Sequence, residues 1–295
     1  MERVCRRAEE QVGLPVRPCY MYALTREGRK PPMVHVRQSL YSLLEPRKKK
    51  ATAVNILGFF APLQQDCELY ELLEGIGVRQ IREISRCRDY GEYQCMAEAN
   101  FNLVLNPEAR FAARDFEERL NIPSIELRRL YQIEKIHSQY QALGAALGTE
   151  FRDENMYRET QNAIARFREK HGALTFALGE CMNGDPFELA VALIRMGYAV
   201  SEIYGTVTDE NFVYVQHLEK LAPELRIYSN LEPTMLHYDC SEAGADVTIG
   251  KDAGYYHPGC PNLPWNEDVQ PFGYAGLRKL LCGLDQVLSE KEKTV

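Results

Sequence analysis

The sequence lacks the features of a membrane, secreted or nucleic-acid-binding protein. No apolar run approaches the roughly 18 residues that a membrane-spanning helix needs, and the charged segment 1–10 has no apolar core typical of a secretory signal. Lys and Arg number 35 against 42 Asp and Glu, so the net charge is −7 and the basic face of a duplex-binding protein is absent. We therefore expect a cytoplasmic protein that binds neither membrane nor nucleic acid.

Cysteine patterns for disulfides or zinc are also missing. The nine cysteines are odd in number, widely spaced and without a CxxC pair, which is typical of reduced thiols in a cytoplasm. His257 and Cys260 form one HxxC pattern with no second pair nearby, whereas zinc needs four ligands. His237 lies three residues before Cys240, so a cysteine nucleophile paired with a histidine is a further alternative. Candidates for an iron–sulfur ligand are Cys67, Cys87, Cys181 and Cys260, and the alternative is that most of these are buried small apolar side chains.

Glycine-rich nucleotide loops are absent. The sequence contains no GxGxxG, Walker A or GxSxG motif, and the two main strand-to-helix connections read GFFAP (58–62) and GECMNG (179–184). The glycines that let a backbone approach a pyrophosphate are missing from both, so we expect no NAD or FAD.

Alternating strand and helix patterns are what the chain does contain. An α/β fold is predicted, with two Rossmann-like domains whose parallel sheets are flanked by helices and a ligand cleft between them. The predicted strands are 53–58, 78–84, 101–105, 173–179 and 198–204. The predicted helices are 1–15, 34–44, 63–75, 88–99, 107–120, 129–147, 153–170 and 185–196. The expected domains are 51–171 and 172–295, preceded by a remnant of another domain at 1–50.

The C-terminal loop is the most distinctive stretch. Residues 255–265 contain the only Trp, and PFGYAG (271–276) leads into the last helix. Rigid aromatic loops are frequent at binding sites. The alternative is a surface loop that only caps the final helix.

Four segments carry a resemblance to a known family. They are VCRRAEEQVGLPVRPC (4–19), VNILGFF…LLEGIGV (54–78), AEANFNLVLNP…FEERLNIPSIEL (97–127) and the Trp265 loop with PFGYAG. In this order they resemble the nitrogenase component 1-type oxidoreductases, which include molybdenum–iron protein subunits, cofactor-assembly scaffold homologues and tetrapyrrole reductases. The resemblance implies three Rossmann-like domains, of which this chain is similar to the second and third.

The departures from the family pattern bear on function. By this resemblance, Leu105 and Asn106 lie where the family has the cysteine that anchors its cofactor, so that thiolate is missing here. Residues 179–182 resemble the family's cofactor loop Gly-Gly-x-Arg, but they contain Glu180 and no arginine. A carboxylate there would repel a large anionic cofactor. Dinitrogen reduction by this chain alone is therefore not expected.

The resemblance implies an oxidoreductase subunit that binds an iron–sulfur cluster, a metallocofactor or a tetrapyrrole-like substrate between its domains. Its implied partners are a homologous component 1 subunit, in a homo- or heterodimer, and an ATP-dependent iron protein reductase. Cys181 and Cys260 are the first candidates for metal ligands. The alternative is a non-catalytic scaffold or the structural half of a heterodimer. The predicted cleft residues are Phe59, Asn106, Glu180, Cys181, Asn183, His257 and Trp265.

Overall fold

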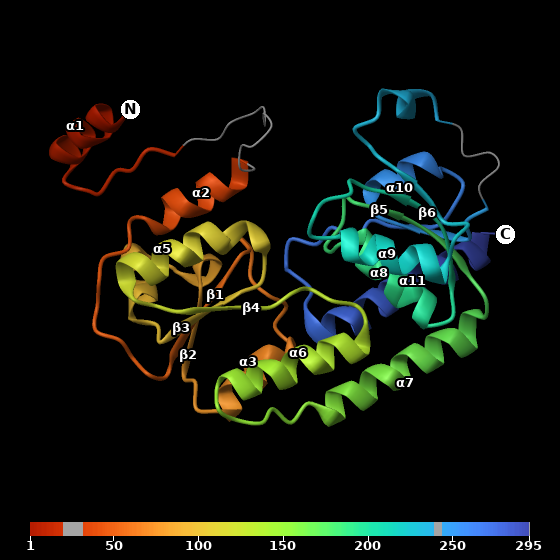
Figure 1. The fold of residues 1–295 in the computed structure, drawn as a ribbon, viewed down its shortest axis with the longest axis horizontal. Helices are drawn as coiled ribbons and strands as arrows, with labels where there is room; N and C mark the ends of the chain where they lie inside the picture. Colours follow the sequence, from red (N-terminus) through yellow and green to blue (C-terminus); the bar gives the residue numbers. More distant parts are fainter. Residues whose placement is uncertain (20–31, 239–243, 295) are drawn as a thin grey trace. The chain divides into compact units, whose positions relative to one another are not determined.

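Two parallel sheets carry the fold (Figure 1), so the predicted α/β class is confirmed. The structure, a computed structural model, describes residues 1–19, 32–238 and 244–294. One compact unit comprises residues 1–62 and 73–128, and the other comprises residues 63–72 and 129–295. The division differs from the expected boundary at 171/172, because helices α6 (Ile133–Ala146) and α7 (Glu154–His171) belong to the second unit, where α7 packs on α11 (Gly273–Thr294).

The sheet of the first unit has the order β2-β1-β3-β4. Its strands are β1 (Ala53–Leu57), β2 (Gln80–Glu83), β3 (Phe101–Val104) and β4 (Ser124–Glu126). Every residue of β1 and β3 is buried, as their apolar runs predict for strands covered on both faces. Its helices are α1 (Glu2–Val12), α2 (Pro32–Tyr41), α4 (Tyr90–Gln94) and α5 (Arg110–Leu120), with 3-10 turns at Ile84–Arg86, Cys95–Glu98 and Pro107–Ala109. Side chains of α2, α4 and α5 form one core cluster, which includes Tyr41, Tyr93 and Phe116.

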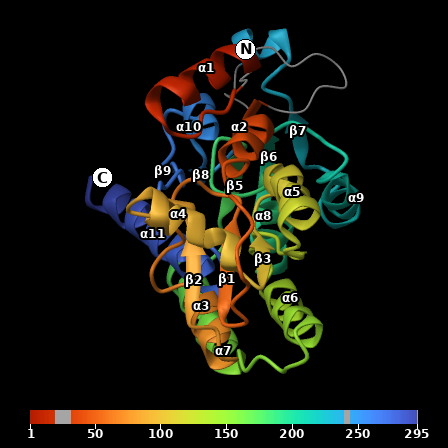
Figure 2. The same cartoon turned by 90° about the vertical axis from the view of Figure 1, so that its left-hand side faces the viewer.

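The sheet of the second unit has the order β7-β6-β5-β8-β9. Its strands are β5 (Thr175–Gly179), β6 (Ala199–Tyr204), β7 (Arg226–Tyr228), β8 (Val247–Ile249) and β9 (Asn262–Leu263). Helices α8 (Pro186–Arg195) and α9 (Phe212–Leu221) lie on one face of this sheet and α10 (Lys251–Tyr256) on the other (Figures 1 and 2). A 3-10 turn spans Pro233–His237.

The start of helix α8 follows its local sequence. The Asp185 carboxylate accepts the backbone N–H groups of Phe187 at 2.9 Å and Glu188 at 3.1 Å, and Pro186 occupies the first turn. An acidic N-cap followed by proline is a favourable helix start. The predicted helix is therefore confirmed.

Several predicted helices are shorter in the structure than expected, and the cause is evident for two of them. The helix predicted from residue 63 is α3 (Glu68–Gly75), because the Gln64 N–H instead bonds the Gln270 carbonyl at 3.1 Å. The helix predicted at 88–99 is divided into α4 and a 3-10 turn, and its start lies at Asp89, whose side chain accepts the Glu92 N–H at 2.8 Å.

In both parallel sheets the order in which the chain adds strands reverses beside the first strand, β1 or β5. The chain places β2 on one side of β1, or β6 and β7 on one side of β5, and then crosses to β3 or β8 on the other side. Such a reversal opens a crevice at the carboxyl ends of the two middle strands, where ligands of α/β proteins bind. The carboxyl ends of β1 and β3, and of β5 and β8, are therefore the expected binding positions.

Across the described part of the chain, every helix is too short or too polar to span a membrane.

Candidate functional site

The carboxyl end of β5 lies against the first turn of α10, which follows β8, at Gly179 and Asp252. A Cβ atom built on Gly179 would lie 1.9 Å from Oδ1 of Asp252, so only glycine fits at this point of the strand. This close contact explains why a glycine ends the predicted strand. The glycine lets the first turn of α10 approach the loop that follows β5.

The Asp252 carboxylate occupies the backbone cradle of that loop. It accepts the N–H groups of Glu180 at 2.8 Å and Cys181 at 3.1 Å, and Asn230 Nδ2 at 2.8 Å. Successive N–H groups between a strand and a helix are the groups that bind phosphates and other anions in many α/β proteins. Here a carboxylate of the chain itself takes the place of such an anion.

Glu180 adds a second negative charge beside Asp252. Its carboxylate accepts the Thr206 N–H at 2.7 Å and Asn230 Nδ2 at 3.0 Å, so one amide joins the two acidic side chains. The Tyr256 hydroxyl in turn donates to Asn230 Oδ1 at 3.2 Å. An incoming anion would meet two like charges at short range, which is unfavourable. The site is therefore suited to a ligand without negative charge.

The donor set does not fit a metal cluster. The Cys181 side chain is largely exposed, but partial desolvation of its thiol and the nearby Asp252 and Glu180 carboxylates raise its pKa, which disfavours the thiolate that metals require. The Cys260 thiol donates to the Ala245 carbonyl at 3.0 Å. Among the residues that the structure describes, no three His, Cys, Asp or Glu side chains are grouped to hold a metal ion.

The other predicted cysteine sites lie in different surroundings. Cys67 is buried with 2% exposure, as the alternative of a small apolar side chain predicts. Burial also raises the pKa of the Cys87 thiol. Cys240, the predicted partner of His237, lies outside the described residues.

His257 is buried in the second unit. Its Nε2 lies 2.9 Å from Glu202 Oε2 and 2.9 Å from the Tyr204 hydroxyl, and its exposure is 3%. Glu202 and the surrounding tyrosines were missed by sequence reasoning. The only available signal was the alternation of β6, which predicts that residues 202 and 204 share a face.

Asn183 and Trp265 contact each other directly, and both are hydrogen-bonded to the Tyr131 hydroxyl. The Asn183 N–H donates to the Trp265 carbonyl at 2.7 Å, and Trp265 Nε1 donates to the Tyr131 hydroxyl at 2.6 Å. The Tyr131 N–H donates to Glu188 Oε2 at 2.9 Å. Trp265 is 2% exposed and has a φ of +43°, so the distinctive loop is a packed support for the loop after β5.

Phe59 and Asn106 belong to the first unit, where they follow β1 and β3. A Cβ built on Gly58 would lie 2.6 Å from the Asn106 nitrogen, and the Asn106 side chain accepts the Glu108 N–H at 3.0 Å. Buried Arg37 donates from Nε to the Gly58 carbonyl at 3.0 Å and forms an ion pair with Glu108. The predicted cleft between the domains stays a prediction.

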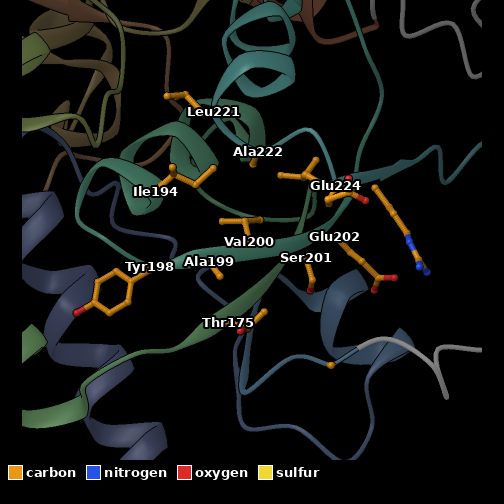
Figure 3. Close-up of a pocket in the computed structure, with 13 residues that line it drawn as sticks. Thr175, Ile194, Tyr198, Ala199, Val200, Ser201, Glu202, Leu221, Ala222 and Glu224 are labelled. Carbon is orange, nitrogen blue, oxygen red and sulfur yellow. The ribbon is translucent and has the colours of Figure 1, made fainter.

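A cavity of about 430 Å³ lies elsewhere in the second unit, where β5, β6 and β7 begin. Figure 3 shows its lining side chains, which come from β6, the end of α8 and the segment after α9. Its apolar lining residues include Ile194, Val200 and Leu225. Because it lies at the amino ends of the strands, it is separate from the site at Glu180 and Asp252.

Comparisons with known proteins agree with this architecture. A family model described as nitrogenase component 1 type oxidoreductase matches residues 1–288. A solved structure of nitrogenase Cp1 at pH 6.5 is similar over 88% of this chain and 65% of that one, with a TM-score of 0.67 and 16% identity. A structure of nitrogenase Cp1 at pH 5 is similar over 97% and 66%, with a TM-score of 0.62 and 16% identity. The chain thus spans just under two thirds of their length, and at this identity the likeness concerns the fold. No curated protein matches the chain.

Proposed function

This chain belongs to the nitrogenase component 1 type oxidoreductase family, and from this membership we propose that it is a subunit of an oxidoreductase complex whose second sheet binds an uncharged or positively charged organic ligand. The family implies a homologous component 1 subunit as partner and an ATP-dependent iron protein as the source of electrons. The observation that supports a ligand without negative charge is that the Asp252 carboxylate already accepts the backbone N–H groups of Glu180 and Cys181.

Three ligand classes follow from the family: an iron–sulfur cluster, an anionic metallocofactor and a tetrapyrrole-like substrate. The first two do not fit, because the described residues contain no group of three metal-ligating side chains and the edge of the sheet carries Glu180 and Asp252. An organic substrate needs neither a thiolate nor a cationic pocket. We therefore favour a tetrapyrrole-like or other organic molecule that brings no negative charge to this edge.

A pair of porphyrins of one size and opposite charge tests the proposal. We expect the chain to bind a porphyrin with four cationic substituents at least about tenfold more tightly than its tetrasulfonated counterpart, a difference of about 1.4 kcal/mol. Absorbance titrations at two salt concentrations measure both affinities. The double variant Glu180→Gln, Asp252→Asn should lose the preference.

Two outcomes would contradict this proposal. One is equal or tighter binding of the sulfonated porphyrin. The other is a stoichiometric iron and sulfide content after strict anaerobic purification, with a visible charge-transfer band that Cys181→Ala abolishes.

Removal of the Asp252 carboxylate should open the cradle to anions. In Asp252→Ala the N–H groups of Glu180 and Cys181 lose their acceptor, so we expect sulfate to bind there with a Kd on the order of 1–10 mM and to raise the Tm of this variant. Thermal unfolding in sodium sulfate, against sodium chloride of equal ionic strength, measures the effect.

Asp246→Ala is the matched control. Asp246 accepts the Thr175 N–H at 2.8 Å at the opposite end of β5, so its loss removes a similar hydrogen bond away from the site. If sulfate raises the Tm of wild type, Asp246→Ala and Asp252→Ala by the same amount, Asp252 does not occupy an anion cradle.

A non-catalytic role, as a scaffold or as the structural half of a heterodimer, is the second candidate. It is favoured by the way in which Glu180, Asp252 and Asn230 satisfy one another. Failure of both porphyrins to bind, with a stable complex between this chain and a component 1 homologue, would favour it.

A further inference from the structure

Five tyrosines form a continuous cluster near the carboxyl edge of the second sheet. The rings of Tyr204 and Tyr256 are stacked with centroids 4.5 Å apart, and Tyr255 lies 5.3 Å from Tyr256. Tyr228 lies 5.7 Å from Tyr204, and Tyr238 lies 4.7 Å from Tyr228. Tyr204 is fully buried whereas Tyr255 is 78% exposed, so the ring contacts lead from the interior to the surface.

A buried carboxylate receives the hydroxyl at the inner end of this path. The Tyr204 hydroxyl donates to Glu202 Oε2 at 2.6 Å, and the Tyr238 hydroxyl donates to Glu202 Oε1 at 2.6 Å. His257 Nε2 lies 2.9 Å from the same Oε2 atom. Glu202 is 1% exposed. A phenol and a carboxylate at this distance are placed for proton transfer without movement of the backbone.

Glu202 is in the form that can accept a proton. Burial pushes its pKa upward, but hydrogen bonds from His257, Tyr204 and Tyr238 outweigh burial and hold the pKa below its ordinary value. Burial and the hydrogen bond to Glu202 raise the pKa of Tyr204, so this phenol keeps its proton at neutral pH. A protonated phenol therefore faces an ionised carboxylate.

The packing has a cost that a purely structural cluster would avoid. A buried ionised carboxylate is expensive unless several donors satisfy it, and well-packed apolar side chains in its place are often neutral or stabilising. Here two hydroxyls and one imidazole surround Glu202, and aromatic rings surround them. Glu202 thus places a proton acceptor beside the Tyr204 hydroxyl, which packing of the core alone does not require.

We infer that Tyr204 is a redox-active residue that gives one electron, through Tyr256 and Tyr255, to a one-electron oxidant at the surface while its phenolic proton passes to Glu202. An organic peroxyl radical is an oxidant of this class. The O–H bond of Tyr204 breaks, and a new O–H bond forms on Glu202 Oε2. The electron reduces the peroxyl radical, which takes a proton from solvent and becomes a hydroperoxide. The products are a neutral Tyr204 phenoxyl radical and a protonated Glu202. This inference does not depend on the proposed function.

Flash oxidation of the intact chain tests the inference. Photochemically generated tris(bipyridine)ruthenium(III) serves as the oxidant, and electron paramagnetic resonance of rapidly frozen samples records the tyrosyl radicals. We expect wild type to form a radical whose lifetime is at least about tenfold longer than in Tyr204→Phe or Glu202→Gln, because both variants remove the proton-coupled site. Formation of the long-lived radical should be slower in D₂O than in H₂O.

Two further variants separate this role from a structural one. Tyr255→Phe changes an exposed ring, so the fold should be kept while the yield of the long-lived radical falls severalfold. Tyr198→Phe is the control, because Tyr198 is also buried but its hydroxyl has no hydrogen-bond partner among the described residues. A wild-type lifetime in Glu202→Gln or Tyr204→Phe, the same yield in Tyr255→Phe, or the absence of a solvent isotope effect would overturn the inference.

Discussion

Replacement of Gly273 by alanine is expected to destabilise the second unit by about 3–5 kcal/mol, the largest effect of any single substitution considered. Gly273 has a φ of +60°, in the left-handed region where a Cβ atom is unfavourable. A Cβ built there would lie 1.9 Å from Glu68 Oε1 and 2.2 Å from the Tyr140 hydroxyl. Both groups are buried and are held by hydrogen bonds that a displacement would break.

The collision matters because Glu68 holds the start of α11. Its carboxylate accepts the N–H groups of Tyr274 at 2.6 Å and Ala275 at 3.0 Å, and the Tyr140 hydroxyl at 2.7 Å. A carboxylate at a helix N-terminus satisfies free N–H groups and is favoured by the helix dipole. Displacement of Glu68 would leave these donors unpaired in the interior. Urea unfolding followed by circular dichroism measures the loss.

Gly148→Ala is the matched control for this prediction. Gly148 has a similar φ of +71°, but nothing lies within 4 Å of a Cβ built on it. Its replacement should therefore cost only the backbone strain of about 1–2 kcal/mol. Equal losses in the two variants would mean that the contacts with Glu68 and Tyr140 have no part in the effect.

The second large effect is a dependence of stability on pH. The free energy of unfolding of wild type should fall between about pH 4.5 and 7, and Glu188→Gln should remove this fall. Glu188 is 1% exposed and accepts the N–H groups of Tyr131 at 2.9 Å and Gln132 at 3.1 Å. Burial raises its pKa to about 7, although the hydrogen bonds from Gln132 and Tyr131 act in the opposite direction. The folded protein therefore keeps a proton on Glu188 over a range in which the unfolded chain has lost it.

The sign of the effect follows from proton binding. Below pH 4.5 both states hold the proton, so the free energy of unfolding is highest with respect to this group. As the pH rises toward 7 the folded state binds more protons than the unfolded state, and the free energy of unfolding falls by about 3 kcal/mol in total. Above pH 7 the loss is complete.

Urea unfolding of wild type and Glu188→Gln at a series of pH values measures this difference. Glutamine keeps one oxygen, which can accept one of the two backbone N–H groups, and it has no proton to lose, so its loss of stability should not depend on pH. Burial also raises the pKa of Glu68, which contributes equally to both proteins, so the difference between the two profiles is the readout. Parallel profiles would show that Glu188 titrates at its ordinary pKa in the folded protein.

Local signals in the sequence were sufficient for the class of fold. The apolar run of β1 predicts a strand covered on both faces, and Asp185-Pro186 predicts the start of α8, because both depend on neighbouring residues alone. The sequence predicts an earlier start for α3 than the structure has, because residues 63 and 64 pair with the backbone of Gln270. That partner is more than 200 positions away, and no local pattern reveals it.

The candidate site was predictable only in part. The sequence alone determined that the loop after β5 lacks the glycines for a pyrophosphate and carries Glu180. Only the tertiary structure decided that Asp252 fills the backbone cradle of that loop and that Glu202 receives the hydroxyls of Tyr204 and Tyr238. The physical reason is the crossover of parallel strands. It brings to one edge of a sheet side chains that are many residues apart, whereas sequence patterns report only the periodicity of a single strand or helix.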